Sequence, residues 1–182
     1  MAEGEWYRPF WGTDLTAELA KISQELSLPE YDLLLIGDGS GTINSKASGW
    51  ACVCFNKHTD EISVHNGAMS CGTNNFAELM PYLQALWVFD QYWSKKGPIG
   101  TVAHIEIISD SELTVKGGNK EYGRNSNQSL WAALTWFETC GRYTIHWNHV
   151  YRNTNLFSHR CDWLAGHTKT VLEKLRRQLL CS

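Results

Sequence analysis

The sequence predicts an α/β domain with a mixed β-sheet, and three observations support this class. Between residues 31 and 68, three strand-like segments follow one another with short polar connections, which indicates an antiparallel meander. Helical and strand-like patterns then alternate to residue 180, as in chains whose later strands are joined by helices. The 182 residues, 43% hydrophobic and 19% charged, are enough for one domain with a sizeable core.

Residues 1–30 are predicted to form an N-terminal extension with a short helix. Thr13 or Asp14 can cap this helix, and apolar residues recur along one of its faces through Leu26. The helix is preceded by an aromatic cluster that contains Trp6, Tyr7 and Trp11. Aromatic side chains in tight clusters usually pack against a domain, which we prefer to the alternative that they stack on nucleic-acid bases.

Residues 31–182 are predicted to form the folded domain. Five strands are expected where apolar residues alternate or run continuously, at residues 31–38, 49–56, 61–68, 101–108 and 143–150. Four helices are expected where an apolar stripe repeats with helical spacing, at residues 75–93, 112–117, 129–140 and 158–180. Pro81 lies past the first turn of the helix at 75–93 and is expected to bend it.

Four acidic side chains lie at the ends of these predicted elements. Asp38 and Asp110 each end a buried strand. Glu78 is close to the start of a helix, and Asp162 is in about the first turn of the last helix. Strand ends and helix starts can converge on one edge of a sheet, where four carboxylates cannot all stay ionised without partners. Divalent cations are their natural partners, and two ions about 3.5–4 Å apart would hold the attacking and leaving oxygens of a phosphodiester displacement.

Short sequence blocks surround the four acids. They are IGDGS at residues 36–40, TNNFAEL at 73–79, SDS at 109–111 and RCDWLA at 160–165. In this order and spacing they resemble the four signature blocks of type 1 ribonuclease H, and the resemblance covers residues 31–166. It implies the ribonuclease H-like fold, a five-stranded mixed sheet with helices on both faces. It also implies an endonuclease that hydrolyses the RNA strand of an RNA–DNA hybrid and leaves 5′-phosphate and 3′-hydroxyl ends.

The resemblance also implies roles for single residues. The acids take the positions of the catalytic ligands of two Mg²⁺ ions, which Mn²⁺ can replace: Asp38, Glu78, Asp110 and Asp162. Asp38 would bridge the two ions, and Glu78 would also sense the 2′-hydroxyl side of the scissile ribose. Small and polar residues match the regions that contact the hybrid from its minor groove: Gly39, Ser40, Gly41, Thr73, Asn74 and Asn75. Short side chains and backbone groups can reach the 2′-hydroxyls that separate RNA from DNA.

The chain departs from the family pattern in three places. Residues 151–155, in the loop before the last helix, contain no histidine, whereas the family usually carries a mobile one there. We predict that His159, one helical turn before Asp162, or Arg152 partly replaces that histidine in proton transfer or product release. The alternative for His159 is a histidine that faces solvent on the helix surface.

The second and third departures concern substrate binding. Residues 119–128 are too short and too weakly charged to form the basic handle with which some family members hold the hybrid, and the N-terminal segment does not resemble the family's hybrid-binding module. Substrate binding must then use the N-terminal aromatics or basic residues elsewhere: Lys116, Lys120, Arg124, Arg152 and Arg160. With a net charge of −3, the chain as a whole carries no basic field.

Composition bounds the setting of the protein. The six cysteines include no CxxC pair, so we expect buried free thiols in a reducing compartment rather than disulfides or a zinc site. There is no signal-peptide pattern and no apolar run of membrane-spanning length. We therefore expect a soluble, cytoplasmic protein of bacterial or viral origin that is not secreted, acts as a monomer and has no membrane or protein partner.

Two alternative functions agree less well with the sequence pattern. Another nuclease of the same fold, specific for DNA or for junctions, is disfavoured by the positions of the acids. Proofreading-type exonucleases need an acid where Ser40 stands, and junction resolvases usually carry paired acids on the final helix, where no acid follows Asp162 before Glu173. A non-catalytic nucleic-acid-binding domain of this fold is disfavoured because all four acids are present.

Overall fold

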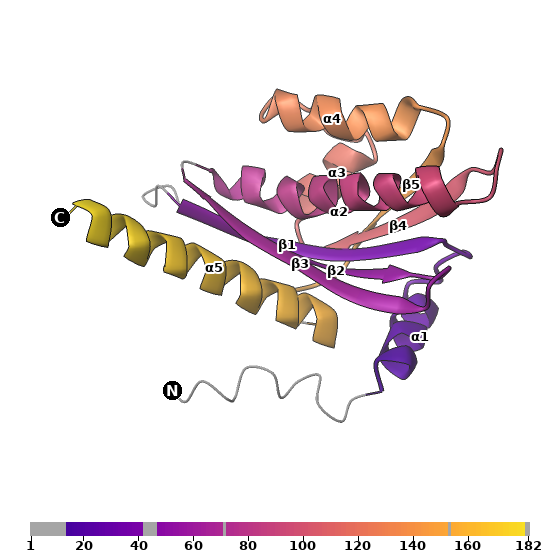
Figure 1. The fold of residues 1–182 in the computed structure, drawn as a ribbon, viewed down its shortest axis with the longest axis horizontal. Coiled ribbons are helices and arrows are strands. Elements are labelled where there is room, and N and C mark those ends of the chain that lie inside the picture. The colour runs from indigo at the N-terminus through magenta and orange to yellow at the C-terminus, as the bar shows by residue number, and fades with distance from the viewer. Residues whose placement is uncertain (1–13, 42–46, 71, 153, 181–182) are drawn as a thin grey trace.

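The structure is a computed structural model that describes residues 14–41, 47–70, 72–152 and 154–180. These residues form a five-stranded sheet with helices on both faces (Figure 1). The strands are β1 (Leu33–Gly41), β2 (Ala47–Asn56), β3 (Glu61–Ser70), β4 (Ala103–Ser109) and β5 (Tyr143–His149). The helices are α1 (Leu15–Glu25), α2 (Asn74–Lys96), α3 (Glu112–Gly118), α4 (Gln128–Thr139) and α5 (Leu156–Leu180). The predicted five-stranded α/β architecture is confirmed.

The sheet is mixed, as the sequence predicts. Its strand order is β3-β2-β1-β4-β5, in which β3, β2 and β1 are antiparallel neighbours and β1, β4 and β5 are parallel neighbours. A short turn at residues 57–60 joins β2 to β3, because antiparallel neighbours need only a tight connection. The parallel strands are joined by crossover helices: α2 lies between β3 and β4, and α3 with α4 lies between β4 and β5.

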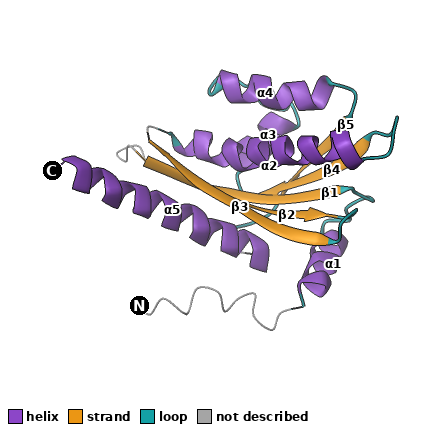
Figure 2. Ribbon diagram, viewed as in Figure 1, coloured by secondary structure: helices purple, strands orange, loops and turns teal. Residues whose placement is uncertain are grey.

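Two apolar cores cover the two faces of the central strand β1. Leu33 and Leu35 point into a core shared with α2, α3 and α4, whereas Leu34 and Ile36 point into a core shared with α1 and α5. Figure 2 shows the three layers, with α2 and α4 on one side of the sheet and α5 on the other. Because both of its faces are buried, the first part of β1 is continuously apolar rather than alternating.

The carboxyl end of β1 differs from the prediction. The sequence predicts that this strand ends at Asp38. In the structure, β1 stays paired with β2 as far as Gly41, which lies opposite Ser48. Its parallel pairing with β4 stops earlier, at Ile36 opposite Ile108. Asp38 therefore lies within β1, just beyond the point at which β1 and β4 separate.

Helix α2 continues through Pro81 as a single element. A proline at this position cannot donate a hydrogen bond to the carbonyl of Ala77, one turn earlier. That carbonyl faces β1, since a Cβ atom added to Gly39 would lie 2.6 Å from its oxygen. Pro81 therefore removes the helical hydrogen bond to the Ala77 carbonyl, and this carbonyl lies against β1.

The last helix begins earlier than predicted. Helix α5 starts at Leu156, so Asp162 lies in its second turn rather than in its first. Asn155 explains the earlier start because its Oδ1 accepts a hydrogen bond from the N–H of Ser158 at 2.8 Å, as a helix N-cap does. The predicted start near Ser158 lies two residues too late, because the capping role of Asn155 is not evident from the local sequence pattern.

Helix α1 belongs to the same folded unit as the sheet. Asp14 caps it, as one of the two predicted caps, by accepting hydrogen bonds from the N–H groups of Thr16 and Ala17. Leu19 and Ile22 are buried in the core on the α5 side. The aromatic cluster at Trp6, Tyr7 and Trp11 lies outside the described residues. No helix in the described part of the chain combines the length and apolar character needed to cross a bilayer.

Candidate active site

Three carboxylates from separate elements meet near the carboxyl end of β1. Asp38 lies in β1, Glu78 lies near the start of α2, and Asp110 directly follows β4. Each offers one oxygen, and these three oxygens all lie within 4.8 Å of one another. The side chains of Asp38 and Glu78 are buried, and Asp110 is half-buried. We refer to these three residues as the acidic cluster.

The separation of β1 and β4 is supported from both faces of the sheet. The buried hydroxyl of Tyr82, on α2, lies 2.8 Å from the carbonyl oxygen of Gly37 and 3.0 Å from that of Ile108, and donates its hydrogen between them. On the other face, the thiol of Cys161, on α5, donates to the carbonyl of Ile36 at 3.1 Å. Where strands part, buried carbonyls need such donors. The two strands therefore separate at a fixed position, and each carries an aspartate beyond it.

Close packing of α2 on β1 brings Glu78 to Asp38. A Cβ atom added to Gly39 would lie 2.4 Å from the backbone nitrogen of Glu78, so any larger residue would push the helix away from the strand. The N–H of Gly39 also donates to Oδ1 of Asp38 at 2.7 Å. The glycine after Asp38 is thus required by the distance between the two elements.

Two residues of the predicted substrate-binding set hold this arrangement together. Thr73 caps α2, since its Oγ1 accepts a hydrogen bond from the N–H of Phe76 at 3.2 Å. Asn74 joins the helix to the strand: its Nδ2 donates to Oε1 of Glu78 at 3.3 Å, and its Oδ1 accepts from the N–H of Gly41 at 2.9 Å. Thr73 and Asn74 therefore position the acidic cluster from the helix side.

Burial and mutual repulsion shift the pKa values of these acids upward. The pKa of Asp38 is raised to about 7, mainly by burial and then by the negative charges of Asp110 and Asp162. The pKa of Glu78 is raised to about 8 by burial and by the charges of Asp38 and Asp110. Burial also raises the pKa of Asp110, and the positive charge of Arg152 opposes this shift. The acidic cluster therefore retains protons near neutral pH unless cations balance its charge.

Two oxygens of the acidic cluster have no hydrogen-bond partner among the described residues. They are Oδ2 of Asp38 and Oε2 of Glu78, and both are buried. A buried carboxylate oxygen without a donor is unfavourable unless a proton or a cation meets it. Closely spaced carboxylate oxygens are the ligands that Mg²⁺ and Mn²⁺ prefer. The residues present thus fit the divalent ions that the family resemblance implies.

Asp162 lies beside the acidic cluster and is held by an ion pair. Nη2 of Arg152 lies 2.5 Å from Oδ1 of Asp162, and Nε of Arg152 lies 3.9 Å from Oδ2 of Asp110. The charge of Asp162 still reaches Asp38 and Asp110, because it helps to raise both of their pKa values. The fourth predicted acid is therefore at the same edge of the sheet and is linked to the acidic cluster through Arg152.

The structure distinguishes between the residues considered as replacements for the family's histidine. Arg152 contacts two of the acids, whereas His159 is exposed on α5, and within the described residues no ion pair or hydrogen bond joins its side chain to an acid. His149, which is not among the predicted site residues, lies closer to the site: its Nε2 is 3.3 Å from the carbonyl oxygen of Asp110. The feature that could have identified His149 is the strand pairing: in the parallel alignment of β4 and β5, His149 lies opposite Ser109, the residue before Asp110.

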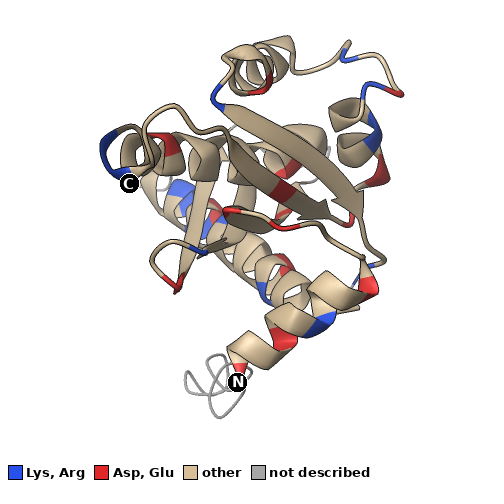
Figure 3. Cartoon of the chain, turned by 90° about the vertical axis from the view of Figure 1, so that its right-hand side faces the viewer, with Lys and Arg blue, Asp and Glu red and all other residues tan. Residues whose placement is uncertain are grey.

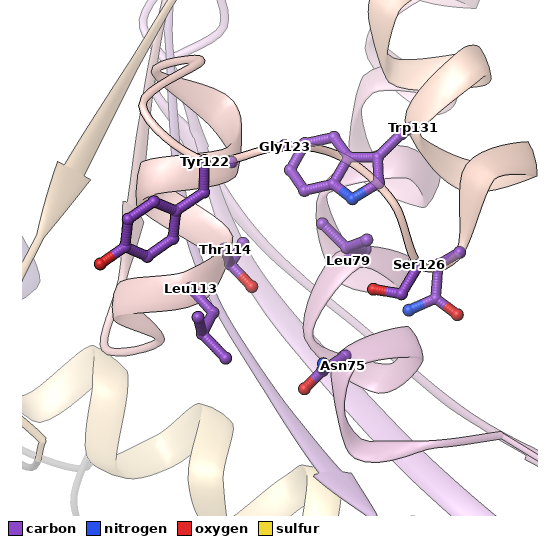
Figure 4. Close-up of a pocket in the computed structure, with 10 residues that line it drawn as sticks. Asn75, Leu79, Leu113, Thr114, Tyr122, Gly123, Ser126 and Trp131 are labelled. Atoms are coloured by element: carbon purple, nitrogen blue, oxygen red, sulfur yellow. The ribbon is translucent and has the colours of Figure 1, made fainter.

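A small pocket adjoins the start of α2 (Figure 4). Its volume is about 110 Å³, and its lining includes Asn75 of α2, Thr114 of α3, Tyr122 of the following loop and Trp131 of α4. Asn75, one of the predicted substrate contacts, is exposed rather than packed in the core. The pocket thus combines an aromatic wall with amide and hydroxyl groups that can form hydrogen bonds.

Two of the five basic residues predicted to hold substrate serve inside the fold. Arg124 forms two hydrogen bonds with Glu138, and its guanidinium lies 4.4 Å from the centre of the Trp131 ring. Arg160 is buried, and its guanidinium lies 4.8 Å from the ring of Trp163. In Figure 3 the Lys and Arg positions are interspersed with Asp and Glu along the chain. Positive charge in the described part of the chain is therefore spread over several elements.

Several solved structures with a similar fold are ribonucleases H. LC11-RNase H1 in complex with an RNA/DNA hybrid matches with a TM-score of 0.63 and 18% identity, over 77% of this chain and 98% of that chain. The N-terminal RNase H domain of a Mycobacterium tuberculosis protein, fused to maltose binding protein, matches with a TM-score of 0.62 and 18% identity, over 81% and 99%. RNase H1 from the archaeon Halobacterium salinarum gives a TM-score of 0.59 and 21% identity, over 75% and 96%. The fold is therefore the ribonuclease H fold.

The sequence then identifies the family within this fold. The family model described as RNase H matches residues 30–169, which is most of the chain and includes all four acids. The chain belongs to the RNase H family, the enzymes that hydrolyse the RNA strand of an RNA–DNA hybrid. The resemblance to type 1 ribonuclease H found in the sequence is confirmed. No curated protein sequence matches this chain.

Proposed function

We propose that this ribonuclease H cleaves its hybrid substrate with two Mg²⁺ ions held by four acids: Asp38, Glu78, Asp110 and Asp162. The observation that carries the proposal is the acidic cluster, in which one oxygen from each of the three acids lies within 4.8 Å of the other two. Two of its buried oxygens lack a partner among the described residues, which leaves them available as ligands. When bound, such ions supply positive charge to the attacking and leaving oxygens of the displacement, which leaves 5′-phosphate and 3′-hydroxyl ends.

The four acids divide by their partners into fixed and adjustable ligands. Asp38 and Glu78 are buried between β1 and α2, so their side chains are fixed before any ion binds. Asp38 interacts electrostatically with Asp110 and with Asp162, which suits the bridging position between two ions. Asp162 is partly exposed and paired with Arg152, so it becomes a free ligand only when Arg152 turns away.

Arg152 is proposed to balance charge and to assist product release rather than to transfer protons. A guanidinium stays protonated at every working pH and cannot act as a base, but it binds phosphate oxygens well. The Arg152 side chain is 67% exposed beside two of the acids, within reach of a phosphate at this edge. His149, beside the Asp110 carbonyl, is the imidazole proposed for proton transfer, whereas the exposed His159 is proposed to have at most a minor part in it.

Substrate contacts are proposed at the carboxyl end of β1 and at the amino end of α2. Ser40 and Gly41 are half-buried at the end of β1, and Asn75 is exposed at the start of α2. All three are small or carry amide or hydroxyl groups, so they can approach the minor groove of a hybrid and bond to its 2′-hydroxyls. Gly39 and Asn74 then act mainly by setting the distance between strand and helix.

A cleavage assay on four labelled substrates tests the proposed function. RNA–DNA hybrid, duplex DNA, duplex RNA and a four-way junction are each incubated with Mg²⁺ or with Mn²⁺. We expect efficient cleavage of the hybrid alone, and no cleavage by Asp38→Asn or Asp110→Asn while the circular dichroism spectrum is retained. Asp60→Asn is the matched control, because Asp60 lies in the exposed β2–β3 turn beyond the end of β2, whereas Asp38 pairs with Ala51 in the middle of that strand. Rapid cleavage by either active-site variant would contradict the proposal.

Oligomeric state and location complete the proposal. We propose a monomer that acts in the cytoplasm on hybrid without a protein partner. Sedimentation of the purified chain with and without hybrid checks the first part, since a dimer that persists on dilution would contradict it. Fractionation of the producing cells checks the second, where recovery in the secreted fraction would contradict it.

A further inference from the structure

A second cluster of chemically reactive side chains lies on the α2-facing side of β2 and β3. Cys52 and Cys54 of β2 point to the same side, and their sulfur atoms are 3.8 Å apart. The antiparallel register sets Cys52 opposite His65 and Cys54 opposite Ser63. Nε2 of His65 in turn lies 3.2 Å from Oγ of Ser63. We call these four residues the thiol cluster, and none of them belongs to the proposed active site.

The thiol cluster opens into a cavity between the sheet and α2. Cys54, Ser63 and His65 line this cavity, whose volume is about 340 Å³. Such a volume accommodates a small molecule. Glu61 on β3 and Tyr92 on α2 are the other titratable side chains in the lining. A reagent in this cavity would therefore meet the Cys54 thiol, the His65 imidazole and the Ser63 hydroxyl together.

Burial and hydrogen bonding separate the two thiols in reactivity. Cys52 is fully buried behind the cavity, whereas Cys54 forms part of its wall. Hydrogen bonding with Cys52, and then with His65 and Ser63, lowers the pKa of Cys54 to about 6 in spite of burial. The hydrogen bond with Cys54 also raises the pKa of His65. Since the thiolate is the nucleophilic form of cysteine, these contacts favour reaction at Cys54.

We propose that Cys54 is a nucleophilic thiol that reacts with small uncharged electrophiles entering this cavity, with His65 as its proton partner. With hydrogen peroxide, the Cys54 sulfur attacks one peroxide oxygen, the O–O bond breaks, and the leaving hydroxide takes a proton from the His65 imidazolium. The products are Cys54 sulfenic acid and water, so the sulfur is oxidised and the peroxide is reduced. Ser63 orients the imidazole, as the third group of a nucleophile–base pair does. This modification site is independent of the proposed nuclease mechanism.

Site-resolved alkylation of the native protein tests the proposal. Changing Cys71→Ser and Cys181→Ser leaves only the four thiols that the structure describes. Limiting iodoacetamide forms a sulfur–carbon bond and releases iodide, and mass spectrometry then measures the rate at each cysteine as a function of pH. Cys140 is the internal reference, a half-buried thiol that donates to the carbonyl of Phe137 at 3.4 Å. We expect Cys54 to react about tenfold faster than Cys140 at neutral pH, with a rate midpoint near the lowered pKa of Cys54.

Variants then identify the role of the imidazole. His65→Gln should slow the reaction of Cys54 at neutral pH and move its midpoint to higher pH, whereas His104→Gln, which removes an exposed imidazole on β4, should change neither. After treatment with peroxide, dimedone should trap sulfenic acid at Cys54. If Cys54 in the wild-type chain reacts no faster than Cys140, or shows the midpoint of an ordinary thiol, the proposal is wrong. The wild-type profile decides this even if His65→Gln does not fold.

Discussion

The acidic cluster and the Arg124–Glu138 pair are two largely buried charged groups with opposite arrangements. Both oxygens of Glu138 accept hydrogen bonds from Arg124, at 2.7 and 3.1 Å. Asp38 and Glu78, by contrast, are like charges that each keep one buried oxygen without a partner among the described residues. A paired and hydrogen-bonded charge is strongly held once it is buried, whereas like charges repel unless an ion joins them. We infer that the Arg124–Glu138 pair stabilises the fold, whereas the acidic cluster is arranged to bind a ligand.

The contacts of Arg124 show which elements it holds together. Its guanidinium also donates to the carbonyls of Gly117 and Gly118 at the end of α3, at 2.8 and 3.1 Å. It lies over the ring of Trp131 on α4, so one side chain ties the end of α3 to α4 across the intervening loop. The comparison can therefore be tested by breaking each group in turn.

The largest expected effect comes from removing one charge of the acidic cluster. Asp38→Asn should lower hybrid cleavage at least about a thousandfold, because a bridging ligand is lost. In the absence of metal, the same change should raise the free energy of unfolding by roughly 1–2 kcal/mol at mildly alkaline pH, because it removes repulsion with Glu78 and Asp110. Steady-state cleavage and urea unfolding in chelator measure the two effects. A variant that is both inactive and less stable would contradict this account.

Breaking the Arg124–Glu138 pair should have the opposite result. Arg124→Met should lower the free energy of unfolding by about 3 kcal/mol, since Glu138 would be left mostly buried without its partner, while cleavage per folded molecule is retained. Urea unfolding and cleavage at low temperature measure this. Lys120→Met is the matched control: Lys120 lies 4.0 Å from the same carboxylate but is 69% exposed, so we expect a change below about 0.5 kcal/mol.

The pH dependence of stability should expose the acidic cluster without any mutation. The raised pKa values of Asp38 and Glu78 mean that the folded chain binds more protons than the unfolded chain between about pH 4 and pH 8. In the absence of metal, the contribution of these groups to stability is therefore greatest below pH 4 and is lost as the pH rises through their folded pKa values. We expect a loss of roughly 2 kcal/mol, reduced in Asp38→Asn and reversed by saturating Mg²⁺. Thermal unfolding across this range measures it.

The smallest expected effects are those on turnover when Arg152 or His159, the residues beside the site, is replaced. Arg152→Ala should lower the turnover number about tenfold and reduce the Mg²⁺ concentration needed for half-maximal rate, because Asp162 is released from its ion pair. His159→Ala should lower turnover less than about twofold, since His159 is exposed. Single-turnover and steady-state rates separate an effect on chemistry from one on product release. Equal losses in the two variants would show that the Arg152 contact is not the relevant one.

Much of the candidate site could be predicted because each of its acids lies in a short, recognisable sequence segment. An acid after an apolar strand, or in the first turns of a helix, is visible from its immediate neighbours. The capping role of Asp14 and the free thiols of the described cysteines follow from equally local features. The continuation of β1 beyond Asp38 could not be predicted in this way, because it depends on the pairing of Gly41 with Ser48 across a loop.

Contacts between distant segments account for the remaining differences. Arg124 is a basic residue in a polar loop by its sequence, yet in the structure it is internal, because Glu138 and Trp131 on α4 face it. Cys54 has the pattern of an inert core thiol, and only the alignment of β3 with β2 sets His65 and Ser63 beside it. These properties belong to pairs of residues and not to either member alone.

The sequence by itself determined the kinds of element, their order, and which acids could hold a cation, because hydrophobic period and turn chemistry act over a few residues. The tertiary structure decided where β1 leaves β4, that Arg152 joins Asp162 to the acidic cluster, and which thiol has an imidazole partner. These outcomes depend on register and on helix-to-strand distance. Both are set by the packing of the whole domain, and no local stretch of the chain specifies them.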